Sequence, residues 1–368
     1  MKIAFDHQIF GWQEYGGISR YFYELAVALS GKFAQDVSVI SPIYVNRYLR
    51  NAPSNLKVSG ISVPRLPRTG RIFRAMNSLL ARLLMRFLHP DIVHETYYSS
   101  TRIAPRNTKV VVTVFDMIHE KFSEHFSPAD PTSREKALAV KRADHVICIS
   151  EQTRQDLIQI LGVDPAKTSV VYLGFTLTEG DNPENAQLVL QRPFLLFVGS
   201  RSGYKNFERL LQAHAASVSL KRDFDLICFG GGSFTQTEKQ LIQSLGFGKN
   251  SVRQISGDDT ILASYYREAR AFVYPSLYEG FGIPPLEAMS FDCPVVCSGV
   301  SSIPEVVGDA GEMFDPYSVE SMSNAIERVV NSEGLREELI ARGRERIKLF
   351  SWERCAQETM NIYMRVLA

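Results

Sequence analysis

The feature that most constrains the fold is a series of short β-branched segments that alternate with helical patterns along the whole sequence. Strands followed by crossover helices build parallel sheets covered on both faces. A chain of 368 residues is too long for one ordinary core. We therefore expect an α/β protein with two doubly wound, Rossmann-like domains facing each other across a cleft. The predicted strand segments are KIAF, VSVIS, DIVHE, KVVVTVFD, HVICIS and SVVYL, then FLLFVGS, DLICFGG, SVRQIS, AFVYPS, PVVCS and EMFD.

A polar, turn-rich stretch, FTLTEGDNPENAQLVLQR, separates these two series of strands. It predicts a first domain over 1–175, a linker over 176–192 and a second domain over 193–352. The last segment, SWERCAQETMNIYMRVLA, has a helical pattern that begins at a serine cap. In sheets of this kind, ligands bind beyond the carboxyl ends of the strands, near helix N-termini.

The composition, 45% apolar and 22% charged, is that of a soluble globular protein. The opening MKIAFDHQIF is interrupted early by Asp6 and His7, which favours a first strand over a signal peptide. No apolar run reaches the length of a membrane-spanning helix. Five cysteines, mostly in predicted strands, suit a reducing compartment better than a disulfide framework. We expect a cytoplasmic protein.

The net charge of +1 conceals a basic segment in the first domain. No acidic residue lies between Asp36 and Asp91, whereas nine Lys and Arg residues do. Within it, RIFRAMNSLLARLLMRFLH predicts an amphipathic helix with Arg74, Arg82 and Arg86 outside its apolar stripe. The stripe could pack on a sheet, or the 65–86 segment could dock on an anionic membrane surface, and we favour docking. The moderate pI and the lack of interleaved aromatics argue against nucleic acid.

The stretch YEGFGIPPLEAM, residues 278–289, combines a glycine turn with a helix start, because proline is tolerated in the first turn of a helix. The backbone N–H groups around residues 280–283 (Gly280, Phe281, Gly282 and Ile283) are predicted to bind an anion at the positive end of that helix. Glu279 lies across the turn, and Glu287 is expected in the first helical turn. Carboxylates suit vicinal hydroxyls. Taken alone, the two glutamates would also be explained as capping or surface acids.

Two further glycine turns follow predicted strands. In FLLFVGSRSGYKNFERLLQA, Gly199 precedes two cations, Arg201 and Lys205, which could neutralise a diphosphate or belong to an ordinary solvated turn. In GWQEYGGISRYFYELAVAL, Gly16 and Gly17 open a helix expected to be capped near Ser19. Neither turn has the glycine order of a P-loop or a dinucleotide fingerprint.

Taken together, YGGISRYFYEL, DIVHETYY, ADHVICISEQTRQDL, VGSRSGYKNFERLL, YEGFGIPPLEAM and FSWERCA resemble glycosyltransferase family 4, the retaining nucleotide-sugar transferases of the GT-B fold. The resemblance implies that Glu279 contacts donor-sugar hydroxyls and Glu287 the ribose, while Arg201 and Lys205 bind the diphosphate. It also implies that the loop of Gly16 and Gly17 closes over the diphosphate, and that the helix at 353–368 packs back on the first domain.

The base of the nucleotide is expected near three positions, for which the sequence gives no side-chain signal: Gly230, Gly231 and Ser256. On the acceptor side, the family often has a histidine before the aspartate that corresponds to Asp116, and here Phe115 stands there. Asp116 or His119 could orient the acceptor, or they could be a surface cap and a core histidine. His94, at a strand end, is the other candidate.

No Asp-x-Asp pair follows a predicted strand, and Asp258 or Asp259 reads as a helix cap, so we expect metal-independent transfer without a cofactor. The expected activity moves a hexose from a GDP- or UDP-sugar to a glycan acceptor, and mannose is the first candidate for the hexose. The segments DHQIF and GGISRYF resemble transferases of bacterial O-antigen, capsule or exopolysaccharide synthesis, whose acceptors are lipid-linked. Two alternatives are a nucleotide-sugar epimerase of the same architecture and a non-catalytic nucleotide-sugar-binding subunit of a membrane assembly complex.

Overall fold

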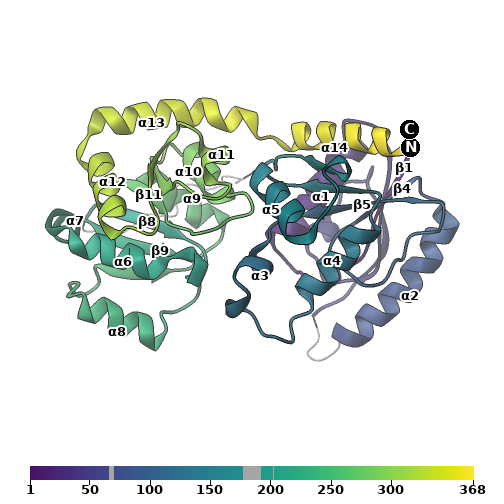
Figure 1. The fold of residues 1–368 in the computed structure, drawn as a ribbon, viewed down its shortest axis with the longest axis horizontal. Coiled ribbons are helices and arrows are strands. Elements are labelled where there is room, and N and C mark those ends of the chain that lie inside the picture. The colour runs from purple at the N-terminus through teal and green to yellow at the C-terminus, as the bar shows by residue number, and fades with distance from the viewer. Residues whose placement is uncertain (66–69, 177–191, 202) are drawn as a thin grey trace. The chain divides into compact units, whose positions relative to one another are not determined.

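The computed structural model of the chain describes residues 1–65, 70–176, 192–201 and 203–368. These residues form two compact units (Figure 1). The first comprises Met1–Gly174 together with Phe350–Ala368, and the second comprises Phe175–Leu349. Most of the linker predicted over 176–192 lies outside the described residues.

The first unit is built on a parallel sheet with the strand order β3-β2-β1-β4-β5-β6-β7. The order reverses between β1 and β4, which is the arrangement of a doubly wound fold. Its strands are β1 (Lys2–Phe5), β2 (Asp36–Tyr44), β3 (Lys57–Ser62), β4 (Ile92–Glu95), β5 (Lys109–Val114), β6 (His145–Cys148) and β7 (Thr168–Val170).

The second unit repeats the plan with a parallel sheet in the order β10-β9-β8-β11-β12-β13. Here the order reverses between β8 and β11. Its strands are β8 (Phe194–Val198), β9 (Asp225–Phe229), β10 (Val252–Ile255), β11 (Ala271–Tyr274), β12 (Val295–Ser298) and β13 (Gly311–Phe314). The prediction of two doubly wound α/β sheets is confirmed.

Every strand segment predicted from the sequence overlaps a strand of the structure. The prediction missed β3, at the edge of the first sheet. Its segment, KVSGIS, is polar and largely exposed, so it lacks the continuous apolar run by which the buried strands are recognised.

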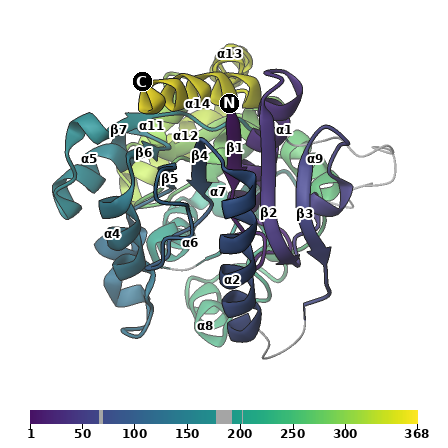
Figure 2. The ribbon, with the colours of Figure 1, turned by 90° about the vertical axis from the view of Figure 1, so that its right-hand side faces the viewer.

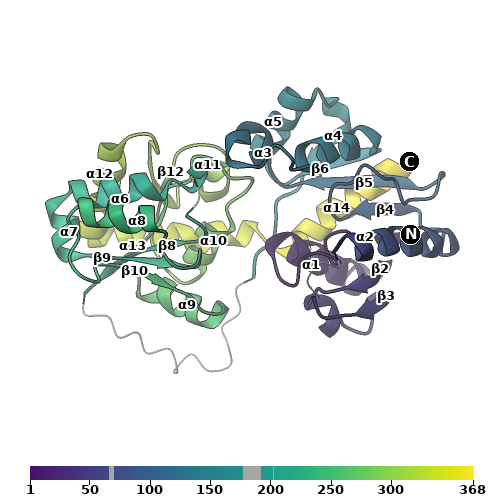
Figure 3. The same ribbon diagram turned by 90° about the horizontal axis from the view of Figure 1, so that it is seen from below.

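Helices cover both faces of each sheet. Figure 3 shows α9 on one side of the second sheet and α6 and α12 on the other. The helices of the first unit are α1 (Gly17–Gly31), α2 (Gly70–Leu88), α3 (Ile118–Lys121), α4 (Thr132–Arg142), α5 (Glu151–Leu161) and α14 (Trp352–Leu367). Those of the second unit are α6 (Phe207–Ala216), α7 (Val218–Asp223), α8 (Gln236–Ser244), α9 (Asp259–Glu268), α10 (Ile283–Ser290), α11 (Ile303–Val307), α12 (Val319–Asn331) and α13 (Glu333–Arg346).

Helix starts follow the local sequence. Ser351 and Asp258 cap α14 and α9, as predicted, by accepting hydrogen bonds from Arg354 N and Ile261 N. The cap expected near Ser19 is wrong. Helix α1 begins at Gly17, and Ser19 lies in its first turn with its hydroxyl donating to the carbonyl of Gly16.

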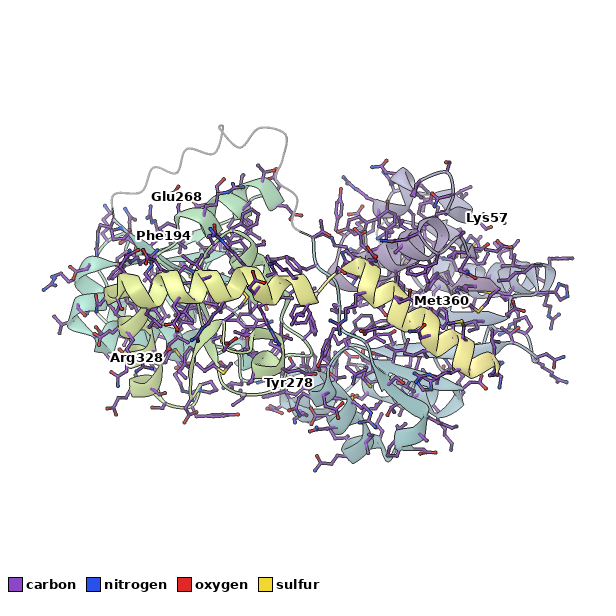
Figure 4. All side chains as sticks on the ribbon, turned by 90° about the horizontal axis from the view of Figure 1, so that it is seen from above. Lys57, Phe194, Glu268, Tyr278, Arg328 and Met360 are labelled. Atoms are coloured by element: carbon purple, nitrogen blue, oxygen red, sulfur yellow. The ribbon has the colours of Figure 1, made fainter. Side chains whose placement is uncertain are left out.

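Helix α14 belongs to the first unit and packs against α1 (Figure 1). Figure 4 labels Met360 on α14. The chain therefore leaves the first unit after Gly174 and returns to it near Phe350. A Cβ on Gly174 would lie 2.3 Å from the backbone N of Trp352. Glycine is needed at this position because the outgoing and returning segments touch there.

Candidate active site

The point where the strand order of the second sheet reverses, between β8 and β11, is where a doubly wound sheet is expected to bind ligand. Lys205 follows β8 and Glu279 follows β11. Lys205 Nζ lies 2.6 Å from Glu279 Oε1, and both side chains are largely buried. The structure thus brings together the two charged residues that the sequence proposed for the donor sugar and the diphosphate.

The turn after β11 is held in place by two serines that follow β12. The hydroxyls of Ser301 and Ser302 donate to the carbonyl of Glu279 at 2.8 and 2.9 Å, and Ser302 also donates to the carbonyl of Phe281 at 2.8 Å. Tyr278, labelled in Figure 4, is buried at the start of the turn. The backbone of this turn is therefore fixed by the neighbouring strand connection.

Helix α10 starts directly after this turn, with Gly282 at its N-cap and prolines at its second and third positions. Because proline has no N–H, the donors at this helix start come from the turn and from Ile283. Glu287 is the fifth helical residue, so the prediction that places it in the first turn is wrong. Its Oε2 accepts a hydrogen bond from Tyr266 Oη at 3.2 Å.

Asn206 connects Lys205 to the end of β11. Its backbone is left-handed, with φ of 60°, and its side-chain amide donates to the carbonyls of Pro275 and Pro316 at 3.0 and 2.8 Å. Asparagine tolerates this conformation better than most residues. The side chain is buried. It therefore fixes the position from which Lys205 reaches Glu279.

Arg201 is placed differently from the prediction. Its guanidinium donates to Glu238 Oε1 at 2.7 Å and to the carbonyls of Gly230, Gly232 and Ser233 at 3.2, 2.9 and 3.1 Å. Its side chain is only 3% exposed. The contacts show a residue that shapes the 230–233 loop, so they do not support a direct diphosphate contact from Arg201.

The glycine loop after β9 lies beside the end of β10. Gln254 donates from Nε2 to Ser256 Oγ at 2.7 Å and to the carbonyl of Gly230 at 3.3 Å. Gly231 has φ of 68°, and a Cβ there would lie 2.8 Å from Arg201 Nη1. Gly230, Gly231 and Ser256, the positions predicted for the base, thus lie together at the carboxyl ends of β9 and β10, next to Arg201.

Tyr274, the last residue of β11, contacts both Lys205 and Glu279. Burial raises its pKa well above the usual value, and the negative charge of Glu279 and a hydrogen bond to it act in the same direction. The tyrosine therefore remains a neutral donor to the carboxylate. Lys205 Nζ also lies 5.8 Å from the centre of its ring.

The acceptor-side candidates lie in the first unit, and His94 is in its core. His94 has no exposed surface, and its ring nitrogens are hydrogen-bonded to Tyr363 Oη at 2.6 Å and Thr113 Oγ1 at 2.8 Å. Burial lowers its pKa to about 3. A histidine bonded on both nitrogens and closed to solvent is not available to a sugar, so the prediction of a catalytic role for His94 is not supported.

Asp116 follows β5, with its side chain 30% exposed. Its Oδ1 accepts a hydrogen bond from Ile118 N at 3.0 Å in the turn before α3, whose N-cap residue is Met117. Below it, the buried ammonium of Lys136 donates to the carbonyl of Asp116 at 2.8 Å and to Glu120 at 2.7 Å. His119 stacks on Phe126. Asp116 thus keeps a partly exposed carboxylate on a rigid support.

Gly16 and Gly17 form the start of α1, where Gly16 is the N-cap residue. The carbonyl of Gly16 accepts from Arg20 N at 2.9 Å, and Gln13 Oε1 accepts from Ser19 N at 3.2 Å. A Cβ on Gly16 would collide with the Gln13 side chain. This is a tight backbone turn after β1, as the sequence predicted.

The sequence reasoning missed four supporting residues: Ser301, Ser302, Asn206 and Lys136. Three of them had a signal. Serines between a strand and a proline-containing helix are typical helix-start residues, and an asparagine after a lysine turn favours left-handed backbone. Lys136 had none, because its burial depends on residues from β5 and α3.

Comparisons with known proteins identify the family of the chain. A family model described as "Glycosyl transferases group 1" matches residues 180–346, and one described as "Glycosyltransferase Family 4" matches residues 15–179. The O-antigen chain mannosyltransferase B of Escherichia coli is 30% identical, over 94% of this chain and 95% of the relative. The chain therefore belongs to glycosyltransferase family 4.

Solved structures support the fold. The sucrose-phosphate synthase of Thermosynechococcus elongatus has a TM-score of 0.76 at 20% identity, covering 100% of this chain and 99% of that one. The HepE protein of Anabaena, solved with UDP and glucose, has a TM-score of 0.72 at 20% identity, covering 99% and 100%. The predicted GT-B fold class is confirmed.

Proposed function

We propose that this glycosyltransferase is a retaining enzyme that moves a hexose from a GDP- or UDP-sugar to a lipid-linked glycan acceptor. Mannose is the first candidate for the hexose. The process would be the synthesis of a bacterial surface polysaccharide such as O-antigen, capsule or exopolysaccharide, on the cytoplasmic face of the plasma membrane. Membership of the family supports glycosyl transfer, and the name of the Escherichia coli relative supports mannose and O-antigen.

The observation that carries the proposal is the Lys205–Glu279 pair, at the strand reversal and beside the start of α10. Cleavage of a nucleotide sugar builds negative charge on the departing diphosphate and positive charge on the anomeric carbon. An ammonium and backbone N–H groups aimed at the diphosphate stabilise that charge, and one such contact commonly contributes about 3 kcal/mol. A carboxylate beside them can hold sugar hydroxyls.

In this proposal Lys205 and the N–H groups of residues 280–283 receive the diphosphate, Glu279 orients the donor sugar and Glu287 binds the ribose. Arg201 keeps the 230–233 loop in the shape that accepts the nucleotide. On the first unit, Asp116 orients the acceptor hydroxyl. The leaving phosphate takes the acceptor proton on the same face, so the configuration at the anomeric carbon is retained.

We further propose that transfer needs no divalent ion, because the diphosphate charge is met by Lys205 and backbone donors. Turnover in the presence of a chelator checks this point. Activity that disappears with EDTA and returns with manganese or magnesium would exclude it.

The function is tested with purified protein, a panel of GDP-, UDP-, ADP- and dTDP-linked sugars, and short mannose-containing acceptors. A nucleotide sugar at a hundred times its Kd adds about 2.7 kcal/mol of apparent stability, so thermal shift identifies the donor first. Mass spectrometry then detects the elongated acceptor, and NMR assigns the new linkage as retained or inverted. An isomerised donor would indicate the epimerase, and binding without any product would indicate the non-catalytic subunit.

A further inference from the structure

Helix α2 turns its apolar side chains away from the protein. It runs along the outside of the first unit (Figure 2), and Phe87 and Leu79 are 83% and 61% exposed. The outward stripe consists of Ile72, Met76, Leu79, Leu80, Leu83, Leu84 and Phe87, all with more than a third of their surface exposed. The stripe therefore does not serve the core, which was one of the two interpretations of this helix.

The inner face of α2 consists of Asn77, Ala81 and Met85, which are buried. Ala81 and Met85 are fully buried in a cluster that includes Ile40 and Val93. Asn77, between them and the start of the helix, donates from Nδ2 to the carbonyl of Ile43 at 2.8 Å and accepts from Ile43 N at 2.7 Å. Turning the stripe inward would break both bonds, so Asn77 fixes which face of α2 points outward.

The surroundings of the stripe are basic. Arg82 and Arg86 lie one turn apart along its border, and Arg86 is exposed. No acidic residue occurs between Asp36 and Asp91. An exposed apolar stripe bordered by arginines is complementary to a surface that offers hydrocarbon and phosphate together.

We propose that α2 lies in the headgroup region of an anionic membrane, with the stripe in the acyl boundary and the arginines on lipid phosphates. A second copy of the chain fits less well, since a two-fold contact would oppose arginines without an acidic partner on the helix. No helix among the described residues is long and apolar enough to cross a bilayer. The inference goes beyond the transfer reaction and holds whatever the donor sugar is.

The first test is sedimentation of the full chain with phosphatidylcholine vesicles, with and without phosphatidylglycerol. The wild type should pellet with the anionic vesicles. Replacing Leu79, Leu83 and Phe87 by Ser should weaken partitioning at least roughly a hundredfold. Replacing Arg82 and Arg86 by Gln should weaken it by about fivefold per arginine at low salt.

Matched controls lie in the second unit, where Val218→Ser and Arg222→Gln change an exposed apolar and an exposed basic residue. Both should sediment like the wild type. Wild-type protein that stays in the supernatant, or a stripe variant that pellets unchanged, would overturn the proposal. So would a wild-type dimer that the stripe substitutions dissociate without any vesicle binding.

Insertion is separated from surface adsorption by Phe87→Trp. Its added fluorescence should shift to the blue with anionic vesicles and be quenched by brominated lipid, whereas that of Val218→Trp should not. A Phe87→Trp signal insensitive to brominated lipid would refute insertion. Transfer to a soluble acceptor should be equal in the wild type and the stripe variant, so failure of membrane binding is distinguishable from failure of the enzyme function.

Discussion

The buried His94 should make the first unit unstable in acid. Its pKa is about 3 in the folded chain, against 6.5 in an exposed histidine, because burial opposes the charged form. The unfolded state therefore binds a proton below about pH 6.5 while the folded state does not, and stability is lost as the pH falls. At 1.4 kcal/mol per pH unit, the loss between about pH 6.5 and about pH 5 is about 2 kcal/mol.

The measurement can address the first unit alone, because both tryptophans, Trp12 and Trp352, lie in it. Urea unfolding followed by tryptophan fluorescence at about pH 7.5 and about pH 5 gives the pH-dependent free energy of unfolding. We expect the wild type to lose about 2 kcal/mol more than His94→Gln over this interval. Other titrating groups cancel in the difference.

His214 provides the control. It is buried in the second unit, where burial lowers its pKa to about 4, so His214→Gln should leave the tryptophan-detected pH dependence unchanged. Equal pH dependence in the wild type and His94→Gln would refute the reasoning. The pH profile of transfer should be the same in both, because a core histidine does not exchange protons with the acceptor.

Two further predictions concern the supports of the site and of the first sheet. Gly231→Ala should destabilise the second unit by about 1–3 kcal/mol more than Gly232→Ala in thermal unfolding. Both glycines have positive φ, but only a Cβ at Gly231 would contact Arg201. Equal losses of stability would contradict this prediction. Arg142→Leu should cost about 1–3 kcal/mol in tryptophan-detected unfolding, because the buried Glu95 carboxyl loses its partner at 2.5 Å and takes up a proton, burial having raised its pKa to about 7. An unchanged free energy of unfolding would contradict this prediction.

The fold was predictable because alternation of strand and helix patterns is a local property of the sequence. The buried strands carry continuous apolar runs, so each was found, whereas the exposed edge strand β3 carries none. The strand ends also indicated which residues form the candidate site. Residues that follow β8 and β11 meet wherever those strands are neighbours, which is why Lys205 and Glu279 could be proposed together before their contact was seen.

Side-chain direction was not predictable in the same way. His94 and Arg201 both follow the pattern of strand-end residues, yet one points into the core and the other back onto the 230–233 carbonyls. The periodicity of α2 showed a stripe but not which way it faces. That direction depends on Asn77 and its bonds to Ile43, a contact between residues 34 positions apart.

The Lys205–Glu279 pair offers a test in which the two partners act with opposite signs. If Lys205 receives the diphosphate, Lys205→Met should weaken binding of GDP or UDP by roughly tenfold to a hundredfold, the loss of one charge-assisted hydrogen bond. Glu279→Gln removes a negative charge 2.6 Å from the same ammonium, so binding of the nucleotide should be equal or tighter while sugar transfer falls. Calorimetry with the free nucleotide measures the first effect, and product formation measures the second.

Lys57→Met, which replaces an exposed lysine of the first unit, is the control for loss of a lysine. Weaker nucleotide binding in Glu279→Gln, or unchanged binding in Lys205→Met, would show that the pair stabilises the turn and does not receive the diphosphate.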